Sequence, residues 1–225
     1  MLKLLEELGF AVVPEVISIR TSDHLIDAME TALRNNEGNY AMRNLAQNVA
    51  AIRELAESKS ILSLAQSILG ENAFVARSLF LDKTPDANWK VAWHQDITIG
   101  VRAKVEVPGF GPWSVKDGIV HVQAPACVLE RMLAIRVHLD ECDRENGPLQ
   151  ILPGSHKEGK LNAKQILAWR ERVEPVTCIV PKGAAVLLRP LVLHASFPAR
   201  APRHRRVVHL EFAAEELGGP LQWAV

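Results

Sequence analysis

Two histidines and one aspartate stand out in this sequence because together they can bind a metal ion. His94 and Asp96 are separated by a single glutamine, and His194 lies about a hundred residues further along the chain. Two histidines and one carboxylate can occupy one face of a ferrous ion and leave the other face open for an oxidant and a cosubstrate. Residues i and i+2 of a β-strand project to the same side, so we expect His94 and Asp96 to reach one metal together. The third ligand must then come from a different strand.

The elements that position these residues fall into a helical part and a strand-rich part. Leucine and isoleucine recur at helical spacing in the first third of the chain, with Ser22 or Asp23 as a candidate helix cap and Gly70 as a candidate helix end. We expect helices at about 2–8, 23–33, 45–55 and 61–69, and a short strand at 10–13.

From about residue 73 the sequence changes to short alternating segments separated by turns. We expect strands at 73–83, 91–96, 132–139, 149–152, 176–180, 184–189 and 206–212, with a short helix at 162–169. The last strand has an apolar face with Val208, Leu210 and Phe212, which we expect to meet the helices. Its other face, which includes Arg205 and His209, can line a polar cavity.

Helices followed by many short strands predict a mainly β fold with N-terminal helices. The expected core is an antiparallel jelly roll, that is, a cupin-like double-stranded β-helix flanked by α-helices. We expect one domain over 1–225, with a helical part at about 1–72 and the jelly-roll core at about 73–215.

Composition limits the classes of partner. The chain has 225 residues and a formal net charge of zero, so its bulk electrostatics do not indicate a nucleic-acid or anionic-membrane partner. The three cysteines are scattered and odd in number, which argues against a secreted disulfide framework. The opening segment is too short and too acidic for a signal peptide, and no apolar run approaches membrane-spanning length. We therefore expect a cytoplasmic protein, and nothing in the sequence specifies an oligomeric state.

Several segments around the metal residues carry a family resemblance. They are the run Trp-His-Gln-Asp at 93–96, Asn-Gly-Pro-Leu at 146–149, Leu-Pro-Gly-Ser-His-Lys-Glu-Gly at 152–159, His-Ala-Ser at 194–196 followed by Arg205, and Glu-Leu-Gly-Phe-Ala-Val-Val at 7–13. In order, spacing and flanking residues the chain resembles the phytanoyl-CoA dioxygenase family of iron(II)- and 2-oxoglutarate-dependent oxygenases, over nearly its whole length.

The resemblance implies roles for five residues. His94, Asp96 and His194 would bind Fe(II), and Arg205 would bind the distal carboxylate of the cosubstrate 2-oxoglutarate. A guanidinium offers a carboxylate a planar donor fork that lysine cannot match. Ser196 can share a strand face with His194 and donate its hydroxyl to the same carboxylate. The implied reaction consumes O2 and 2-oxoglutarate, releases succinate and CO2, and hydroxylates or otherwise oxidises a small molecule. Related halogenases lack the carboxylate, so Asp96 favours hydroxylation over halogenation.

Some neighbouring residues compete for these roles. Arg203 and Arg206 are close rivals of Arg205, and Arg205 is preferred because its distance from His194 fits the family. The resemblance leaves His156 as a loop residue rather than a ligand.

The substrate side is less defined by the sequence. The stretch 97–131 is long enough to be a lid over the site, or alternatively a surface hairpin with Trp113 as a packing anchor. Arg136 and His138 share one face of an expected strand, and Arg102 adds a further basic group. This basic surplus would suit a small molecule that bears a carboxylate.

Two alternatives remain beside the oxygenase. A cupin-like metal-dependent isomerase or hydrolase would share the metal site but have no use for Arg205 as a carboxylate anchor. A non-catalytic metal-binding relative would usually lose one member of the ligand set, and this chain keeps all of them.

Overall fold

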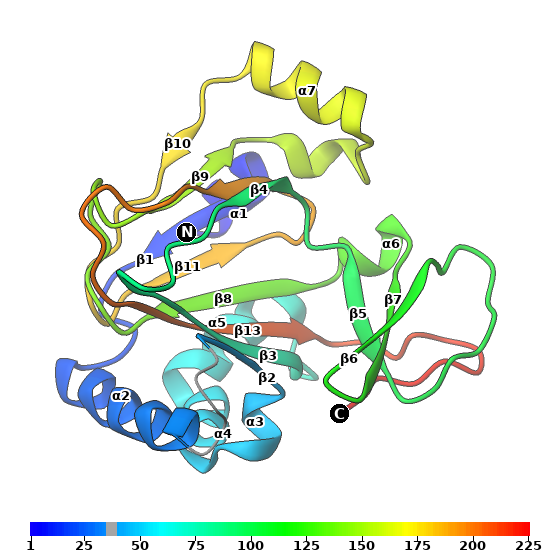
Figure 1. Ribbon diagram of the computed structural model, residues 1–225. Coiled ribbons are helices and arrows are strands. Elements are labelled where there is room, and N and C mark those ends of the chain that lie inside the picture. The colour runs from blue at the N-terminus through cyan, green and yellow to red at the C-terminus, as the bar shows by residue number, and fades with distance from the viewer. Residues whose placement is uncertain (35–39) are drawn as a thin grey trace.

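The computed structural model describes residues 1–34 and 40–225, in which two antiparallel sheets face each other (Figure 1). The six-stranded sheet runs in the order β1 (Phe10–Val13), β11 (Ala185–Leu188), β8 (Leu133–His138), β13 (Arg205–Ala213), β3 (Phe74–Lys83) and β2 (Ala41–Arg43). The four-stranded sheet consists of β10 (Val176–Thr177), β9 (Leu149–Leu152), β12 (Leu193–Ser196) and β4 (Val91–His94). A third sheet, at the right of Figure 1, consists of β5 (Thr98–Val101), β7 (Ile119–Gln123) and β6 (Trp113–Lys116).

Helices cover the outer side of the larger sheet. The described residues form seven α-helices, α1 (Leu2–Leu8), α2 (Ile19–Arg34), α3 (Leu45–Asn48), α4 (Ala50–Glu57), α5 (Lys59–Leu69), α6 (Ala126–Leu129) and α7 (Ala163–Arg172), and one 3-10 helix, η1 (Ser155–Glu158). Helices α2 to α5 lie beneath the six-stranded sheet in Figure 1, and α7 lies beyond the four-stranded sheet. The fold is therefore mixed α and β, with more helix than the expected mainly β fold.

The main hydrophobic core lies between helices α2 to α5 and the six-stranded sheet. Val208, Leu210 and Phe212 of β13 are buried in it, as the apolar alternation of that strand predicts. Phe80 of β3 is buried in the same cluster, while its neighbours Leu79 and Leu81 point to the opposite face and line a cavity. Strands β13 and β3 therefore present one apolar face to the helices and one face to the space between the sheets.

The start of α2 differs from the expected one. The helix begins at Ile19, and the Ser18 hydroxyl accepts a hydrogen bond from the Thr21 backbone N–H at 3.0 Å. Ser22, expected as a cap, is buried inside the helix and donates its own hydroxyl to the Ser18 carbonyl. A hydroxyl can cap a helix or bond back to its own backbone, so the serine four residues earlier was the better candidate.

The remaining expected elements are close to the observed ones. Val49 has an extended backbone and divides the expected helix at 45–55 into α3 and α4. Helix α7 begins with a capping box between Asn162 and Gln165. Gly9 ends α1 in the left-handed region at φ 83°, where a Cβ atom would lie 2.5 Å from Nδ1 of His156. His156 was expected in a loop but belongs to the 3-10 helix η1, and its Nε2 bonds to the Glu6 carbonyl, away from the metal residues.

The stretch 97–131 forms secondary structure of its own. It contains the antiparallel strands β5, β6 and β7 and the short helix α6, with Trp113 packed against a cluster that includes Val122. The alternative of a hairpin with a tryptophan anchor therefore describes this stretch better than an open lid. Among the described residues, no helix is long and apolar enough to cross a membrane.

Candidate metal centre and adjoining pocket

Three side chains converge where the edge strand β4 of the four-stranded sheet meets its neighbour β12. His94 ends β4 and is directly paired with His194 of the antiparallel strand β12, and their ring centroids are 4.2 Å apart. Nε2 of His94 lies 3.6 Å from Oδ1 of Asp96, and Nε2 of His194 lies 3.6 Å from Oδ2. The cross-strand register therefore brings together residues a hundred positions apart, and one ligand atom from each can reach a common point.

Backbone carbonyls orient both imidazole rings. Nδ1 of His94 lies 2.8 Å from the Ala92 carbonyl, and Nδ1 of His194 lies 3.0 Å from the Val192 carbonyl. A carbonyl only accepts, so Nδ1 carries the proton in each ring and Nε2 presents its lone pair to the cluster. Metal-binding histidines in proteins are oriented in this way.

Asp96 reaches the cluster from a loop, which corrects the expected strand at 91–96. Strand β4 ends at His94, and the Asp96 backbone N–H donates to the Pro190 carbonyl at 2.9 Å. The intervening Gln95 is buried and its amide nitrogen bonds to the carbonyls of Gly159 and Leu191. Gln95 thus fixes the turn that lets its two neighbours point to one place.

The electrostatics of the cluster suit a cation. Burial alone would raise the pKa of the Asp96 carboxyl, but His194, His94 and His209 outweigh it and hold the pKa well below its usual range. Burial lowers the pKa of His194 to about 4, so this ring is neutral near pH 7. Oδ2 of Asp96 is buried without a hydrogen-bond partner. Burial lowers the pKa of His94 as well, but Asp96 outweighs it and raises that pKa, so this ring competes for a proton at the same point. An ionised carboxylate with an unpartnered oxygen, beside two imidazoles, fits a divalent metal that displaces this proton.

Arg205 lies at the other end of the same cavity. Its side chain is buried, and Nη1 donates to the Gly147 carbonyl and, at 3.2 Å, to Oγ of Ser196. Its Nε is buried without a partner. Arg203 instead is exposed and pairs with Asp143. Of these two arginines, only Arg205 faces the cavity.

Arg206, the third member of this basic run, points to the opposite face of β13. Its guanidinium pairs with Asp140 at 3.0 Å and with Glu30 of helix α2 at 3.1 Å. The alternation of the strand therefore separates Arg205 from Arg206, whereas Arg203 precedes β13 and pairs with Asp143 at the surface.

Lys83 is a site residue that sequence reasoning did not select. It lies opposite Arg205 in the backbone register of β3 and β13, and it is 1% exposed. Its Nζ donates to Oγ of Ser196 and to the Phe197 carbonyl, both at 2.7 Å. Burial, with the charge of Arg205, lowers the pKa of Lys83 to about 7. Its place on the inward face of an alternating strand was the available signal, because a buried lysine needs a specific partner.

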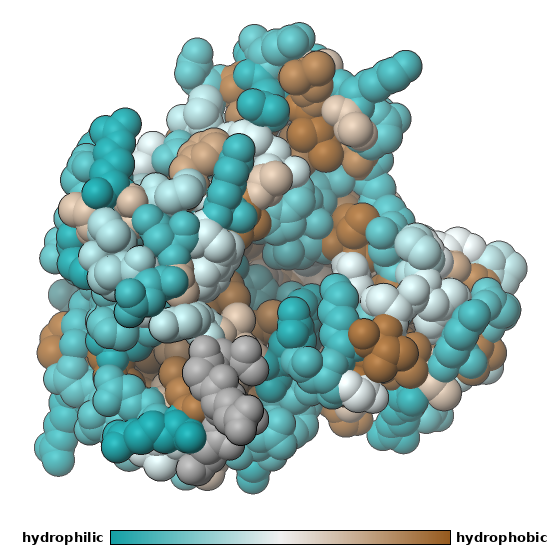
Figure 2. Space-filling view, in the orientation of Figure 1, coloured by the Kyte–Doolittle hydropathy of each residue, from teal (hydrophilic) through white to brown (hydrophobic). Residues whose placement is uncertain are grey.

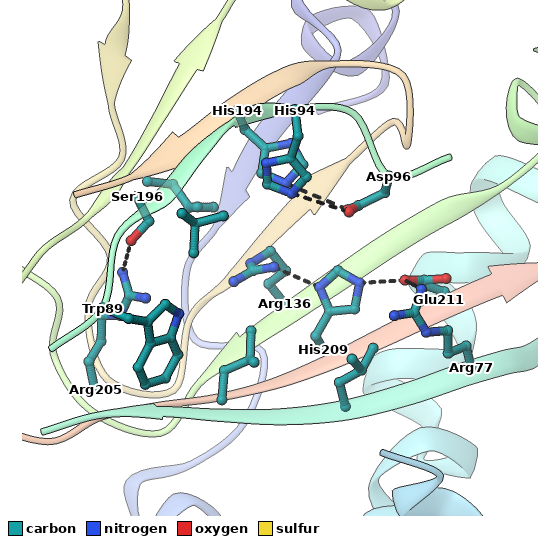
Figure 3. A pocket seen from close by; sticks show the side chains of 14 residues that line it. Arg77, Trp89, His94, Asp96, Arg136, His194, Ser196, Arg205, His209 and Glu211 are labelled. Atoms are coloured by element: carbon teal, nitrogen blue, oxygen red, sulfur yellow. Dashed lines mark hydrogen bonds and ion pairs between the residues drawn. The ribbon is translucent and has the colours of Figure 1, made fainter. Parts of the chain in front are cut away.

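The metal cluster and Arg205 share one cavity of about 190 Å³ between the two large sheets. Figure 2 shows a recess near the centre of this face of the molecule, and Figure 3 shows the side chains that line the cavity. Its lining consists of Arg77, Leu79, Leu81, Trp89, Val91, His94, Asp96, Arg136, Leu149, His194, Ser196, Arg205, His209 and Glu211.

A chain of hydrogen bonds forms the floor of this cavity (Figure 3). Nη1 of Arg136 lies 2.7 Å from Nδ1 of His209, and Nε2 of His209 lies 3.0 Å from Oε1 of Glu211. Glu211 also accepts from Arg77 at 3.1 Å. All four residues are on strands of the larger sheet, so this floor is built on a rigid scaffold.

The structure separates the expected substrate residues into two groups. Arg136 lines the cavity, as expected, whereas His138 is fully enclosed and does not reach it. Trp113 packs into the cluster beside the third sheet. Arg102 bonds to Gln222 and to the Val225 carbonyl at the end of the chain. The last two do not line the cavity, and the stretch after Asp96 that was expected to carry them over the site forms the third sheet.

Comparison with known proteins decides the family. The model of the phytanoyl-CoA dioxygenase family, PhyH, matches residues 5–207. The chain belongs to this family. The matched range includes the four-stranded sheet, the larger sheet except for most of β13, the three residues of the metal cluster and Arg205.

Two curated relatives illustrate the range of this similarity. The "Probable alpha-ketoglutarate-dependent hypophosphite dioxygenase" of Stutzerimonas stutzeri is 26% identical over 180 residues, which cover 74% of this chain and 54% of that protein. The ectoine dioxygenase of Sphingopyxis alaskensis is 26% identical over 131 residues, covering 58% of this chain and 36% of that protein. The chain thus spans about half the length, or less, of these relatives.

Solved structures share the fold. AviO1 from Streptomyces viridochromogenes Tue57 matches 97% of this chain and 95% of its own, with a TM-score of 0.70 and 21% identity. EctD from S. alaskensis, with 2-oxoglutarate and 5-hydroxyectoine, matches 94% of this chain and 74% of its own, with a TM-score of 0.73 and 19% identity. At these identities the likeness establishes the fold of the chain.

Proposed function

We propose that this PhyH-family protein is an Fe(II)- and 2-oxoglutarate-dependent dioxygenase that hydroxylates or otherwise oxidises a small molecule. The observation that carries the proposal is one cavity with two complementary ends. At one end His94, Asp96 and His194 present ligand atoms to a common point, and Oδ2 of Asp96 has no hydrogen-bond partner. At the other end the buried cations Arg205 and Lys83 have no carboxylate partner among the described residues.

Each end has a distinct task in this proposal. His94, Asp96 and His194 would hold Fe(II), which when bound activates O2 at the expense of 2-oxoglutarate, with succinate and CO2 as products. Arg205 would bind the distal carboxylate of 2-oxoglutarate through its guanidinium edge. Ser196 would donate to the same carboxylate after its hydroxyl turns away from the Gly147 carbonyl, to which it donates in this structure.

Two further groups support the carboxylate end. Lys83 adds a second positive charge and bonds to Oγ of Ser196, which fixes that hydroxyl. The Gly147 carbonyl accepts from both Arg205 and Ser196 and orients them. In this proposal the turn at Gly147 has two roles: it connects elements of the fold, and its carbonyl positions the side chains that would bind 2-oxoglutarate.

The arginine end argues against the two alternatives. A cupin-like isomerase or hydrolase would need only the metal end, and burying two unpaired cations has a cost in free energy that such an enzyme would not recover. A non-catalytic metal-binding relative would have no need for them either. An anionic cosubstrate offsets this cost each time it binds.

The decisive experiment is anaerobic titration of the metal-free protein with Fe(II) and then with 2-oxoglutarate. We expect a visible charge-transfer band when the 2-oxo acid chelates the bound iron. Succinate, which lacks the 2-oxo group, is the matched control and should give no band. Bound iron without a band on adding 2-oxoglutarate would rule out the dioxygenase.

The proposal extends to finer points. We propose that the two facing sheets are a jelly-roll core, that residues 1–225 act as one domain, and that the substrate is a small molecule bearing a carboxylate or a similar group. The three cysteines are free thiols, which suits a reducing cytoplasm. Hypophosphite and ectoine, named for the two curated relatives, are the first substrates to test.

A further inference from the structure

We propose that Arg136 is the specificity-determining residue of this enzyme and binds a compact monoanionic group of the substrate, a carboxylate or a comparable oxyanion. The inference rests on the proposed function and deepens it, because it assigns the substrate class to a named side chain. It starts from a hydrogen-bond donor of Arg136, in the cavity floor, that has no acceptor among the described residues.

Arg136 faces the cavity with hydrogen-bonding capacity to spare. The residue is 6% exposed and lines the cavity below the histidine pair (Figure 3). Its Nη1 donates to His209, but its Nε is buried without a hydrogen-bond partner among the described residues. A guanidinium has five N–H donors arranged to meet a carboxylate or an oxyanion with two parallel bonds. A buried donor that lacks a partner is costly, and a bound anion would supply that partner.

The hydrogen bonds of the floor fix the protonation of its members. Arg136 can only donate, so Nδ1 of His209 accepts and the proton of the neutral ring is on Nε2. That N–H points to Oε1 of Glu211, which is also paired with Arg77. The negative charge of Glu211 is thereby balanced by Arg77 within the floor. The positive charge of Arg136 has no such counter-charge there, because its partner His209 is a neutral imidazole.

The balance of charge around the cavity is positive. The charged side chains in or directly behind its wall are Arg77, Lys83, Arg136, Arg205, Asp96 and Glu211. Bound Fe(II) and the dianion 2-oxoglutarate cancel each other, so a positive surplus remains even when Lys83 is neutral. Charges interact strongly in a buried site of low dielectric constant, so this surplus favours an anionic substrate over a neutral or cationic one.

A second metal ion is a weaker occupant of the floor. Ligand atoms of Asp96, His209 and Glu211 also lie within 4.8 Å of one another. However, Nδ1 of His209 is occupied by Arg136, and Glu211 is paired with Arg77. A cation at this point would face two guanidinium groups, whereas an anion would be attracted by both.

The size of the cavity limits the substrate. Pockets for drug-sized ligands usually enclose about 300–1,000 Å³. This cavity encloses about 190 Å³ and must also admit 2-oxoglutarate. The part of the substrate that reaches Arg136 is therefore small.

Matched pairs of small probes test this inference. Acetate, propionate and lactate are each compared with acetamide, propionamide and lactamide, which have nearly the same shape without the charge. The probes are added anaerobically to the protein loaded with Fe(II) and 2-oxoglutarate, and the shift of the charge-transfer band is followed. Calorimetric titration of the same pairs, with and without metal, measures binding independently of the chelate. We expect at least one acid to bind about 10- to 100-fold tighter than its amide, as a charged hydrogen bond implies.

Variants assign the effect to Arg136. Arg136→Gln should remove the preference for the acid, and Arg136→Lys should keep part of it through the retained charge. Arg131→Gln is the matched control, because Arg131 is exposed and pairs with Glu215 away from the cavity. Circular dichroism and thermal unfolding identify any variant that does not fold, and Arg136→Lys then provides the comparison.

The outcomes separate this inference from the proposed function. Normal 2-oxoglutarate affinity in Arg136→Gln, together with loss of acid binding, supports it. Acids and amides that bind equally, or no acid binding in any titration, would overturn it while leaving the dioxygenase intact. Weaker 2-oxoglutarate binding with unchanged acid binding would assign Arg136 to the cosubstrate instead and would also overturn it. Failure of the chelate band in the unmodified protein contradicts the proposed function, and calorimetry still decides the anion site.

Discussion

The two faces of strand β13 differ in what they contribute to the molecule. On the helix side, Val208 and Phe212 are fully buried among apolar side chains. On the cavity side, Arg205, His209 and Glu211 are almost as deeply buried but carry charge or polar atoms. Burying apolar area stabilises a fold, whereas burying charge costs free energy unless it is compensated. One strand therefore stabilises the protein with alternate residues and places the remaining ones in the cavity.

The largest effect should come from removing a ligand on the cavity side. His194→Ala should reduce iron affinity by more than about 100-fold, since loss of even a residue that only supports a ligand costs 10- to 100-fold. Thermal unfolding of the metal-free variant should change little compared with the loss of activity. Iron binding by calorimetry and succinate release measure the effect.

His156→Ala is the control for that experiment, because His156 lies in the 3-10 helix η1 outside the cavity. Equal iron affinity in His194→Ala and the unmodified protein would show that the metal is bound elsewhere.

The next effect tests the helix side. Phe212→Ala should lower the free energy of unfolding by about 3–5 kcal/mol, because it leaves a cavity in the main core. Urea unfolding measures this change. The folded fraction should still bind one iron per chain with unaltered affinity, and a parallel loss of iron affinity would show that the two faces are not independent.

Arg205→Ala should give an intermediate effect on the cavity side. Loss of a charged hydrogen bond of about 1.5–3 kcal/mol corresponds to roughly 10- to 100-fold weaker 2-oxoglutarate binding. Iron affinity should stay within about threefold, because the arginine does not touch the metal cluster. Arg203→Ala is the matched control, and a larger effect of Arg203→Ala would move the carboxylate anchor to that residue.

The smallest effect concerns the buried charge of Lys83. Its pKa is about 7 in the folded protein, against 10.5 for an ordinary lysine. Between these pH values the unfolded chain binds more protons, so the Lys83 contribution makes the free energy of unfolding rise with pH. Lys83→Met should flatten that rise, in urea unfolding measured from pH 6.5 to 10. Parallel curves for the variant and the unmodified protein would show that Lys83 titrates normally.

Strand alternation made much of the fold predictable. The side chains of a strand alternate between its two faces even when both faces are buried. The apolar face of β13 packs against the helices through Val208, Leu210 and Phe212, and the polar face lines the cavity through Arg205 and His209, as predicted. Boundaries were less predictable. Strand β4 ended at His94 because the next residues bond to loops, and those partners are distant in sequence.

The site was predictable where local sequence carries the chemistry. The metal residues have a recognisable spacing, and the structure brings all three together. Lys83 was missed because its environment depends on Arg205 and Ser196, which come from two other strands. Trp113 and Arg102 were placed near the site because a long connection resembles a lid, and no local pattern shows which way it folds.

Strand β4 lies at the edge of its sheet and is paired with β12 alone. A metal held by His94 and His194 would therefore act as a cross-link that closes a loop of about a hundred residues. Without the metal, the backbone hydrogen bonds between β4 and β12 hold the two ends of this loop together. Closing a loop of that length removes conformational freedom mainly from the opened states. Amide hydrogens of β4 would then exchange with solvent more slowly when metal is present, and the strand that supplies the first ligand would be secured by the ion it binds.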